Sequence, residues 1–170
     1  MIYANSIKIA RESRGLSQSD LSKLIGVTQA TLSRFEKGVL DVTPDAVKKI
    51  GVALNYPESF FERDVRWVGE SSLFYRKRAS MTVKHLSVLE SKISILSKSI
   101  DELLESIDIP ELRIPAVEPS AENSPQEIAY KIRLFLGVPA GPVDKIVSLL
   151  EKNGVIVMYI DLDDMDKFDG

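Results

Sequence analysis

The chain has 170 residues, of which 44% are hydrophobic, 28% charged and 7% aromatic, a composition typical of a globular protein. No stretch approaches the ~18 consecutive apolar residues of a membrane-spanning helix, and the first residues lack the layout of a secretory signal peptide. The composition therefore predicts a cytoplasmic protein with no membrane partner. The sequence has no cysteine, which excludes disulfides and thiolate metal sites.

The net charge of −3 is unevenly distributed. Residues 1–80 hold 13 Lys and Arg against 9 Asp and Glu, a net charge of +4, whereas residues 81–170 hold 9 against 16, a net charge of −7. The basic residues 1–80 (the front) and the acidic residues 81–170 (the back) predict that only the front contacts a polyanion. The small positive surplus predicts few phosphate contacts per subunit, and hence binding as a homodimer.

The front begins with a helix over residues 5–14, followed by two short helices joined by a tight turn. Ser17 is a good N-cap for the first of these two, because the acidic Asp20 three residues later forms a capping-box pattern with it. Gly26 suits the left-handed residue that ends that helix. Thr28 is the N-cap of the next helix, which ends at Gly38.

The helix over residues 28–37 has two distinct faces. Leu32 and Phe35 face inward, while the outward side chains are slim enough for the major groove of DNA. Glutamine suits adenine, arginine suits guanine, and alanine can contact the thymine methyl group. The predicted base-contacting residues are Gln29, Ala30, Ser33 and Arg34.

The pattern G-L-S-Q-x-x-L-x-x-x-x-G-V-T-x-x-x-L-S-x-F-E-x-G over residues 15–38 resembles the lambda-repressor-like helix-turn-helix of the XRE family. The resemblance implies a five-helix domain whose third helix reads DNA, and it implies a structural role for Glu36. It also implies that Gln18 contacts a phosphate and braces the reading helix. The predicted backbone-contacting residues are Gln18, Thr28, Thr31 and Lys37. The alternative interpretation is a plain helical hairpin with a polar face.

Thr43-Pro44-Asp45 predicts the start of a fourth helix, and Pro57 with Phe60 and Phe61 predicts a short fifth one. The expected fold class is mainly α, with a DNA-binding domain over residues 1–63. Residues 64–81 form a connector that is too apolar for a free linker. Its basic run over residues 76–78 either extends the basic footprint toward DNA or forms a solvated turn.

Residues 82–108 predict one long helix with a heptad pattern. Isoleucine at one seam position and leucine at the other favour a parallel two-stranded coiled coil, whereas additional apolar positions favour packing inside the chain. Both interpretations remain open. The seam residues are Leu86, Leu89, Ile93, Leu96, Ile100, Leu103 and Ile107.

The back of the chain begins with a linker over residues 109–123, followed by a small α+β segment over residues 124–170. This segment has two helices, 124–137 and 143–153, and a strand, 155–160. Its motifs L-G-V-P-x-G-P, K-N-G-V-I-V and D-D-M-D-x-F-D-G resemble the start of an ImmA/IrrE-type metallopeptidase domain. That family's zinc site is an H-E-x-x-H helix, but His85 is the one histidine in this sequence. We therefore expect no catalytic residue, metal or cofactor, and no enzymatic activity.

Together these features predict a sequence-specific DNA-binding transcriptional regulator, a homodimer that binds an inverted repeat in double-stranded DNA. One alternative is the DNA-binding regulatory portion of a zinc metallopeptidase whose catalytic helix lies beyond this chain. Another is an antitoxin-like DNA-binding protein that binds a protein partner through its C-terminal half.

Overall fold

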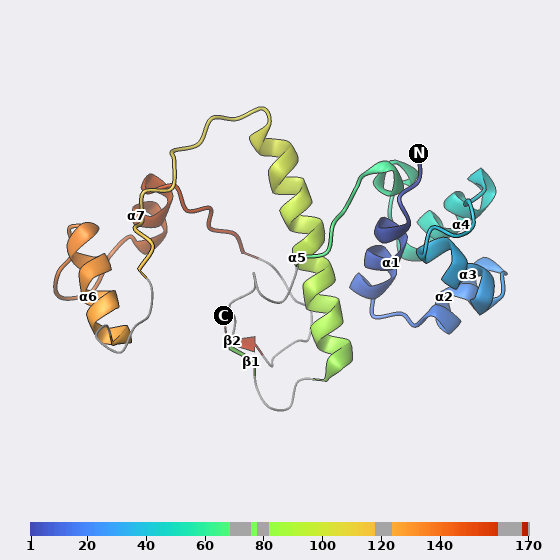
Figure 1. Ribbon diagram of the computed structural model, residues 1–170, viewed down its shortest axis with the longest axis horizontal. Coiled ribbons are helices and arrows are strands. Elements are labelled where there is room, and N and C mark those ends of the chain that lie inside the picture. Colours follow the sequence, from blue (N-terminus) through green and yellow to red (C-terminus); the bar gives the residue numbers. More distant parts are fainter. Residues whose placement is uncertain (69–75, 78–81, 118–123, 160–167, 170) are drawn as a thin grey trace. The chain divides into compact units, whose positions relative to one another are not determined.

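The computed structural model describes residues 1–68, 76–77, 82–117, 124–159 and 168–169, and these are mainly helical, as predicted. The chain divides into two compact units, Met1–Glu105 with Leu162–Gly170, and Ser106–Asp161. In chain order the elements are α1 (Ala4–Ser13), α2 (Gln18–Ile25), α3 (Gln29–Glu36), α4 (Pro44–Leu54), the 3-10 helix η1 (Glu58–Glu62), β1 (Arg76–Lys77), α5 (Val83–Leu104), α6 (Pro125–Phe135), α7 (Ile146–Lys152) and β2 (Phe168–Asp169) (Figure 1).

The predicted starts of α2, α3 and α4 are present as N-caps, whereas α1 begins at Ala4, one residue before the predicted start, and has no side-chain cap. The Ser17 hydroxyl accepts a hydrogen bond from the backbone N–H of Asp20 at 3.1 Å, and the Asp20 carboxylate accepts one from the Ser17 N–H at 3.0 Å. The hydroxyls of Thr28 and Thr43 cap α3 and α4 by accepting the backbone N–H groups of Thr31 and Ala46. Each such cap contributes about 1 kcal/mol of stability. The predicted fifth helix is the 3-10 helix η1, which begins after Pro57.

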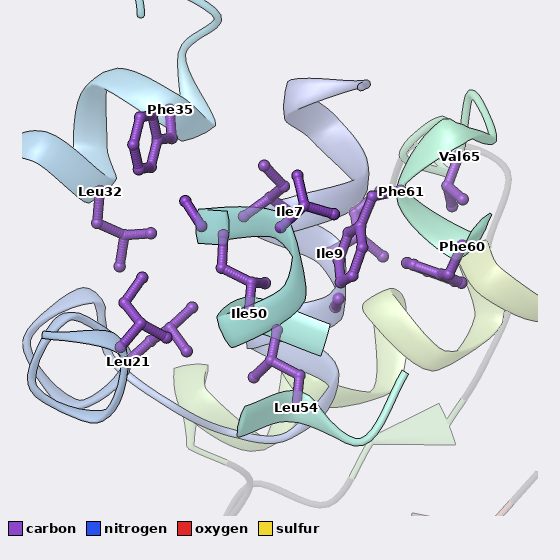
Figure 2. Close-up of a cluster of buried hydrophobic side chains, with 14 residues drawn as sticks. Ile7, Ile9, Leu21, Leu32, Phe35, Ile50, Leu54, Phe60, Phe61 and Val65 are labelled. Carbon is purple, nitrogen blue, oxygen red and sulfur yellow. The ribbon is translucent and has the colours of Figure 1, made fainter. Parts of the chain in front are cut away.

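A single hydrophobic core lies among α1 to α4 and η1 (Figure 2). Leu21 from α2 and Leu32 from α3 lie together at one end, and Ile50 from α4 lies near the middle. Phe61 from η1 is fully buried, and the backbone carbonyl of the same residue accepts a hydrogen bond from the N–H of Tyr3 at 2.8 Å. Each fully buried side chain of this size contributes about 1.5–3 kcal/mol, so the core holds the short helices in one arrangement.

Helix α5 packs against α1 within the first unit. The helix begins after Thr82, whose hydroxyl accepts the N–H of His85 at 3.3 Å, and ends before the last predicted seam residue, Ile107. Contacts of α5 with residues 1–68 involve residues outside the seam, namely Lys84, Ser87, Val88, Ser94, Ile95, Ser99 and Glu102, while Leu89 of the seam is buried as well. This face of α5 therefore serves packing within the chain, and pairing through the seam stays a prediction.

The second unit combines local contacts with a contact between distant segments, in which the N–H of Arg113 donates to the carbonyl of Asn153 at 3.0 Å. Helix α6 begins with the predicted capping box, in which the Glu127 carboxylate accepts the Ser124 N–H at 2.7 Å. Neither α6 nor α7 contains a buried residue. Helix α7 begins at Ile146, three residues later than predicted, after a turn at residues 144–145.

The predicted strand over residues 155–160 is wrong for its described part, because residues 155–159 belong to no strand. A strand needs a neighbouring strand to pair its backbone groups. The N–H of Val155 instead donates to the carbonyl of Leu150 at 3.1 Å, at the end of α7. Residue 160 lies outside the described residues. The strands that the structure does describe are β1 and β2, an antiparallel pair in which Arg76 lies opposite Asp169.

Among the described residues, the structure contains no helix that is both long and apolar enough to cross a membrane.

Candidate nucleic-acid interface

Helices α2 and α3 form a helix-turn-helix. Helix α2 ends at Gly26, whose φ of 72° places it in the left-handed region that glycine adopts without strain. Two residues later Thr28 caps α3, so the turn between the two helices is short. Leu21 and Leu32 are both fully buried and fix the angle between the helices through the common core.

The structure leaves most of the predicted base-contacting side chains open to solvent. Gln29, Ala30 and Arg34 of α3 are exposed, and Ser33 is half-buried. Arg34 lies in the last turn of the helix, where its backbone carbonyl accepts hydrogen bonds from Val39 and Leu40. The exposed side of α3 is therefore slim and polar, which is the shape that the major groove accepts.

The predicted backbone-contacting residues lie at the two ends of this helix pair. Thr28 and Lys37 are exposed at the start and end of α3, whereas Thr31 is half-buried. The hydroxyls of Thr28 and Thr31 are 2.9 Å apart, and the Thr28 hydroxyl also accepts the N–H of Thr31 at 3.1 Å. Both threonines thus complete the helix cap, with Thr28 still accessible from outside.

Gln18 braces the end of α3, because its side-chain amide donates to the Glu36 carboxylate at 2.9 Å. Glu36 also accepts two hydrogen bonds from the buried guanidinium of Arg11, at 2.6 Å and 3.0 Å. Arg11 donates further to the carbonyl of Leu16 at 2.7 Å and to Glu12 at 3.1 Å. This bridge joins α1, the start of α2 and the end of α3.

The electrostatics of the bridge keep Arg11 charged. Burial disfavours the guanidinium cation, but hydrogen bonding and the charge of Glu36 outweigh this, so the pKa of Arg11 is raised above its ordinary value. The family resemblance implied a structural role for Glu36 but did not identify its partner. The available indication was that Arg11 lies one turn beyond the buried Ile7, on the inner face of a helix where a charge needs a counter-charge.

The exposed apolar Val39 and Leu40, which follow α3, also border this surface and were missed by the sequence analysis. Within the part of the chain that the structure describes, no group of three or more His, Asp or Glu residues is placed to hold a metal ion. The exposed Arg34 and Lys37 give the surface positive charge, and the exposed Thr28 and Gln29 give it hydrogen-bonding groups.

Comparison with known proteins agrees with this geometry. A family model described as Helix-turn-helix matches residues 7–61. Antitoxin HipB of Escherichia coli K12 is 33% identical over 75 residues, which cover 38% of this chain and 85% of HipB. The chain belongs to the helix-turn-helix family. The HipB of Escherichia coli O6:H1 is 32% identical over 75 residues, covering 38% of this chain and 80% of that protein. No solved structure matches the chain.

The helix-turn-helix domain and its curated relatives identify the protein as a DNA-binding regulator. The matched residues span α1 to η1 and contain every predicted DNA-contacting residue.

Proposed function

We propose that this helix-turn-helix protein is a sequence-specific transcriptional regulator that binds as a homodimer to an inverted repeat. The observation that carries the proposal is the exposed polar side of α3, held in place from behind by the buried Arg11–Glu36 pair. In helix-turn-helix proteins the second helix of the motif enters the major groove while the first crosses the backbone. Here those helices are α3 and α2.

Each candidate residue has a distinct role in this proposal. Base edges are contacted by Gln29, Ala30, Ser33 and Arg34, with Arg34 hydrogen-bonding guanine. The protein is fixed on the sugar–phosphate backbone by Gln18, Thr28, Thr31 and Lys37. Gln18 is suited to this task because Glu36 already orients its amide group.

A homodimer would place two α3 helices in half-sites about 34 Å apart, one turn of DNA. The small surplus of positive charge in residues 1–80 supports two copies, because a single domain neutralises few phosphates. The heptad seam of α5 supports pairing between copies. Leu103 of the seam is 60% exposed, although Leu89 of the seam is buried within the chain.

The test is selection of duplexes from a random pool by the purified chain, followed by binding measurements on Arg34→Ala. We expect Arg34→Ala to weaken cognate binding by about 1–3 kcal/mol and to relax the preference at one base pair in each half-site. Arg66→Ala is the matched control, because Arg66 is exposed and forms an ion pair with Asp64 outside the proposed interface. An equal loss on cognate and random duplexes would show that Arg34 contacts phosphate instead.

A second proposal concerns residues 106–161, which we propose bind a protein partner in the manner of an antitoxin. Its helices bury no residue, and Tyr130, Leu134 and Phe135 of α6 are about half exposed. The relatives named antitoxin support this direction. If a toxin is encoded beside this chain, co-expression should restore growth, and Leu134→Ser with Phe135→Ser should abolish the rescue while DNA binding is retained.

The resemblance of residues 127–170 to the start of an ImmA/IrrE-type domain supports a third proposal, that this chain is the regulatory portion of a zinc metallopeptidase. An H-E-x-x-H motif encoded downstream in the same reading frame would support it. A stop codon directly after Gly170 would rule it out.

A further inference from the structure

The basic residues of α1 are engaged within the fold. The Lys8 ammonium lies 5.4 Å from the centre of the Trp67 ring. Arg11 is buried between Glu12 and Glu36. Arg14 donates to the carbonyl of Leu54 at 2.8 Å, and its guanidinium lies 4.6 Å from the centre of the Tyr56 ring. Three cations that precede Gln18 in sequence are thus held by contacts within the chain.

Helix α5 brings another cation to this end of the domain. Gly15 joins α1 to α2 with a φ of +63°, and a β-carbon added to it would lie 3.2 Å from Cε of Lys84 and 3.4 Å from Cγ2 of Val88. On the same side of α5, the Ser87 hydroxyl donates to the Glu12 carboxylate at 2.8 Å. Lys84, Ser87 and Val88 lie on one face of α5. Their contacts fix the first turns of α5 against the α1–α2 junction.

The ammonium group of Lys84 remains open to solvent at this junction. The Lys84 side chain is exposed although its stem lies against Gly15. Hydrogen bonds from Ser17 are the main reason that the pKa of Asp20 is lowered, and the charge of Lys84 adds to the effect. The positive charge of Lys84 therefore reaches the beginning of α2. Gln18 is three residues from Gly15, a chain length that spans at most about 11 Å.

We propose that Lys84 of α5 contacts a DNA phosphate beside Gln18, so that the DNA interface includes a helix outside the helix-turn-helix domain. This inference rests on the proposed binding of DNA through α2 and α3. A lysine ammonium is a compact point charge that binds phosphate without reading sequence. It supplies positive charge at the α2 end of the interface, where Arg11 and Arg14 are engaged in the fold. Arg34 and Lys37 lie at the far end of α3.

The experiment is a salt titration of DNA binding by the full chain, measured by fluorescence anisotropy on a cognate and a random duplex. Each neutralised phosphate contributes about 0.9 to the slope of log affinity against log salt concentration. We expect Lys84→Gln to reduce the magnitude of this slope by about 0.9 per subunit and to weaken both duplexes by the same factor. Lys84→Arg should retain the wild-type slope.

Lys98→Gln is the matched control. Lys98 lies on the same helix, 14 residues further on, where it forms an ion pair with Glu102 at 3.5 Å. At about 1.5 Å per residue this is roughly 21 Å from Lys84, so its removal changes the net charge equally without touching the interface. Equal slopes for Lys84→Gln and Lys98→Gln would overturn the inference.

A second variant tests whether the packing of α5 against Gly15 positions the charge of Lys84. Val88→Asp should detach the start of α5 from Gly15 and reduce the slope as much as Lys84→Gln does. An unchanged slope in Val88→Asp would also refute the inference. Failure of the wild-type chain to bind any duplex at low salt would instead refute the proposed function itself, so the two failures are distinguishable.

Discussion

The buried bridge between Arg11 and Glu36 makes a quantitative prediction for Glu36→Gln. The Glu36 side chain is 2% exposed and accepts two hydrogen bonds from Arg11. Removing one partner of a buried ion pair costs about 3–5 kcal/mol, because the remaining charge is left buried. Arg11 would retain Glu12 and the carbonyl of Leu16, which reduces the expected cost to about 2–4 kcal/mol.

Urea and thermal unfolding of the full chain measure this loss. One kcal/mol corresponds to about 4–8 °C in the melting temperature of a domain of 60–100 residues, so Glu36→Gln should lower it by roughly 10 °C or more. Glu12→Gln is the control, because its side chain is more exposed and its loss leaves Glu36 in place. If Glu36→Gln lay within about 0.5 kcal/mol of wild type, as surface substitutions usually do, the structural role of the bridge would be refuted.

The double variant Arg11→Met with Glu36→Leu separates stability from DNA binding. Replacing both members of a buried ion pair by apolar residues is often neutral or stabilising, so we expect the double variant to unfold near the wild-type midpoint. It nevertheless removes the carboxylate that orients Gln18 at 2.9 Å. Its DNA affinity should therefore remain below that of wild type. If the double variant matched wild type in both stability and DNA affinity, the Glu36 carboxylate would not be needed to orient Gln18.

Two further predictions concern stability. The pKa of Glu102 is lowered chiefly by the hydrogen bond from Arg63, and the pKa of Asp20 by those from Ser17. Because both groups have a lower pKa folded than unfolded, their stabilisation is present above their ordinary values of 4.5 and 3.8 and is lost as the pH falls through the folded pKa. The melting temperature, measured from about pH 6 to about pH 2, should fall in this acid range, and it should fall less steeply for Glu102→Gln. A melting temperature that does not change with pH would contradict this expectation. Phe61→Ala removes a fully buried ring and should cost about 3–5 kcal/mol in urea unfolding, whereas Val52→Ala at an exposed site should stay within about 0.5 kcal/mol; equal effects would contradict the observed core.

The elements of the helix-turn-helix could be predicted because their determinants are local. An N-cap hydroxyl accepts the backbone N–H of the residue three positions later, so such a cap can be recognised from the sequence. Ser17, Thr28 and Thr43 all form the expected caps. The inward positions of Leu32 and Phe35 follow from helical spacing. Five of the eight predicted contact residues are exposed and Gln18, Thr31 and Ser33 are half-buried, and DNA contact itself stays a prediction.

Features that depend on residues distant in sequence could not be predicted. Arg11 and Glu36 are 25 positions apart, and nothing local to either residue identifies the other. The apolar run after Gly154 matched a strand, but a strand also requires a partner ladder, which no local pattern supplies. In both cases the structure depends on an interaction between residues too far apart in sequence for a local periodicity pattern to detect.

The long helix shows a different limit. Its apolar seam indicated where packing should occur, yet Ser91 and Ser94 outside the seam are almost fully buried. Serine side chains are small, and the Ser94 hydroxyl donates to the Glu90 carbonyl at 2.7 Å and accepts the N–H of Val68 at 3.0 Å, whereas the buried Ser91 hydroxyl has no hydrogen-bond partner among the described residues. A serine-rich face can therefore approach another segment closely, while hydrophobic periodicity counts it as solvent-facing.

Contacts within the chain reduce the number of basic residues that residues 1–80 can offer to DNA. Residues 1–80 hold 13 basic residues, but several of them are engaged within the chain, including Arg11, Arg14 and Arg63. Fewer cations therefore face a phosphate than the composition implies. Because affinity rises with the number of phosphates neutralised, a single domain of this kind binds weakly. The proposed second copy of the chain and the proposed cation from α5 would each compensate for this deficit, and the salt dependence of binding counts both.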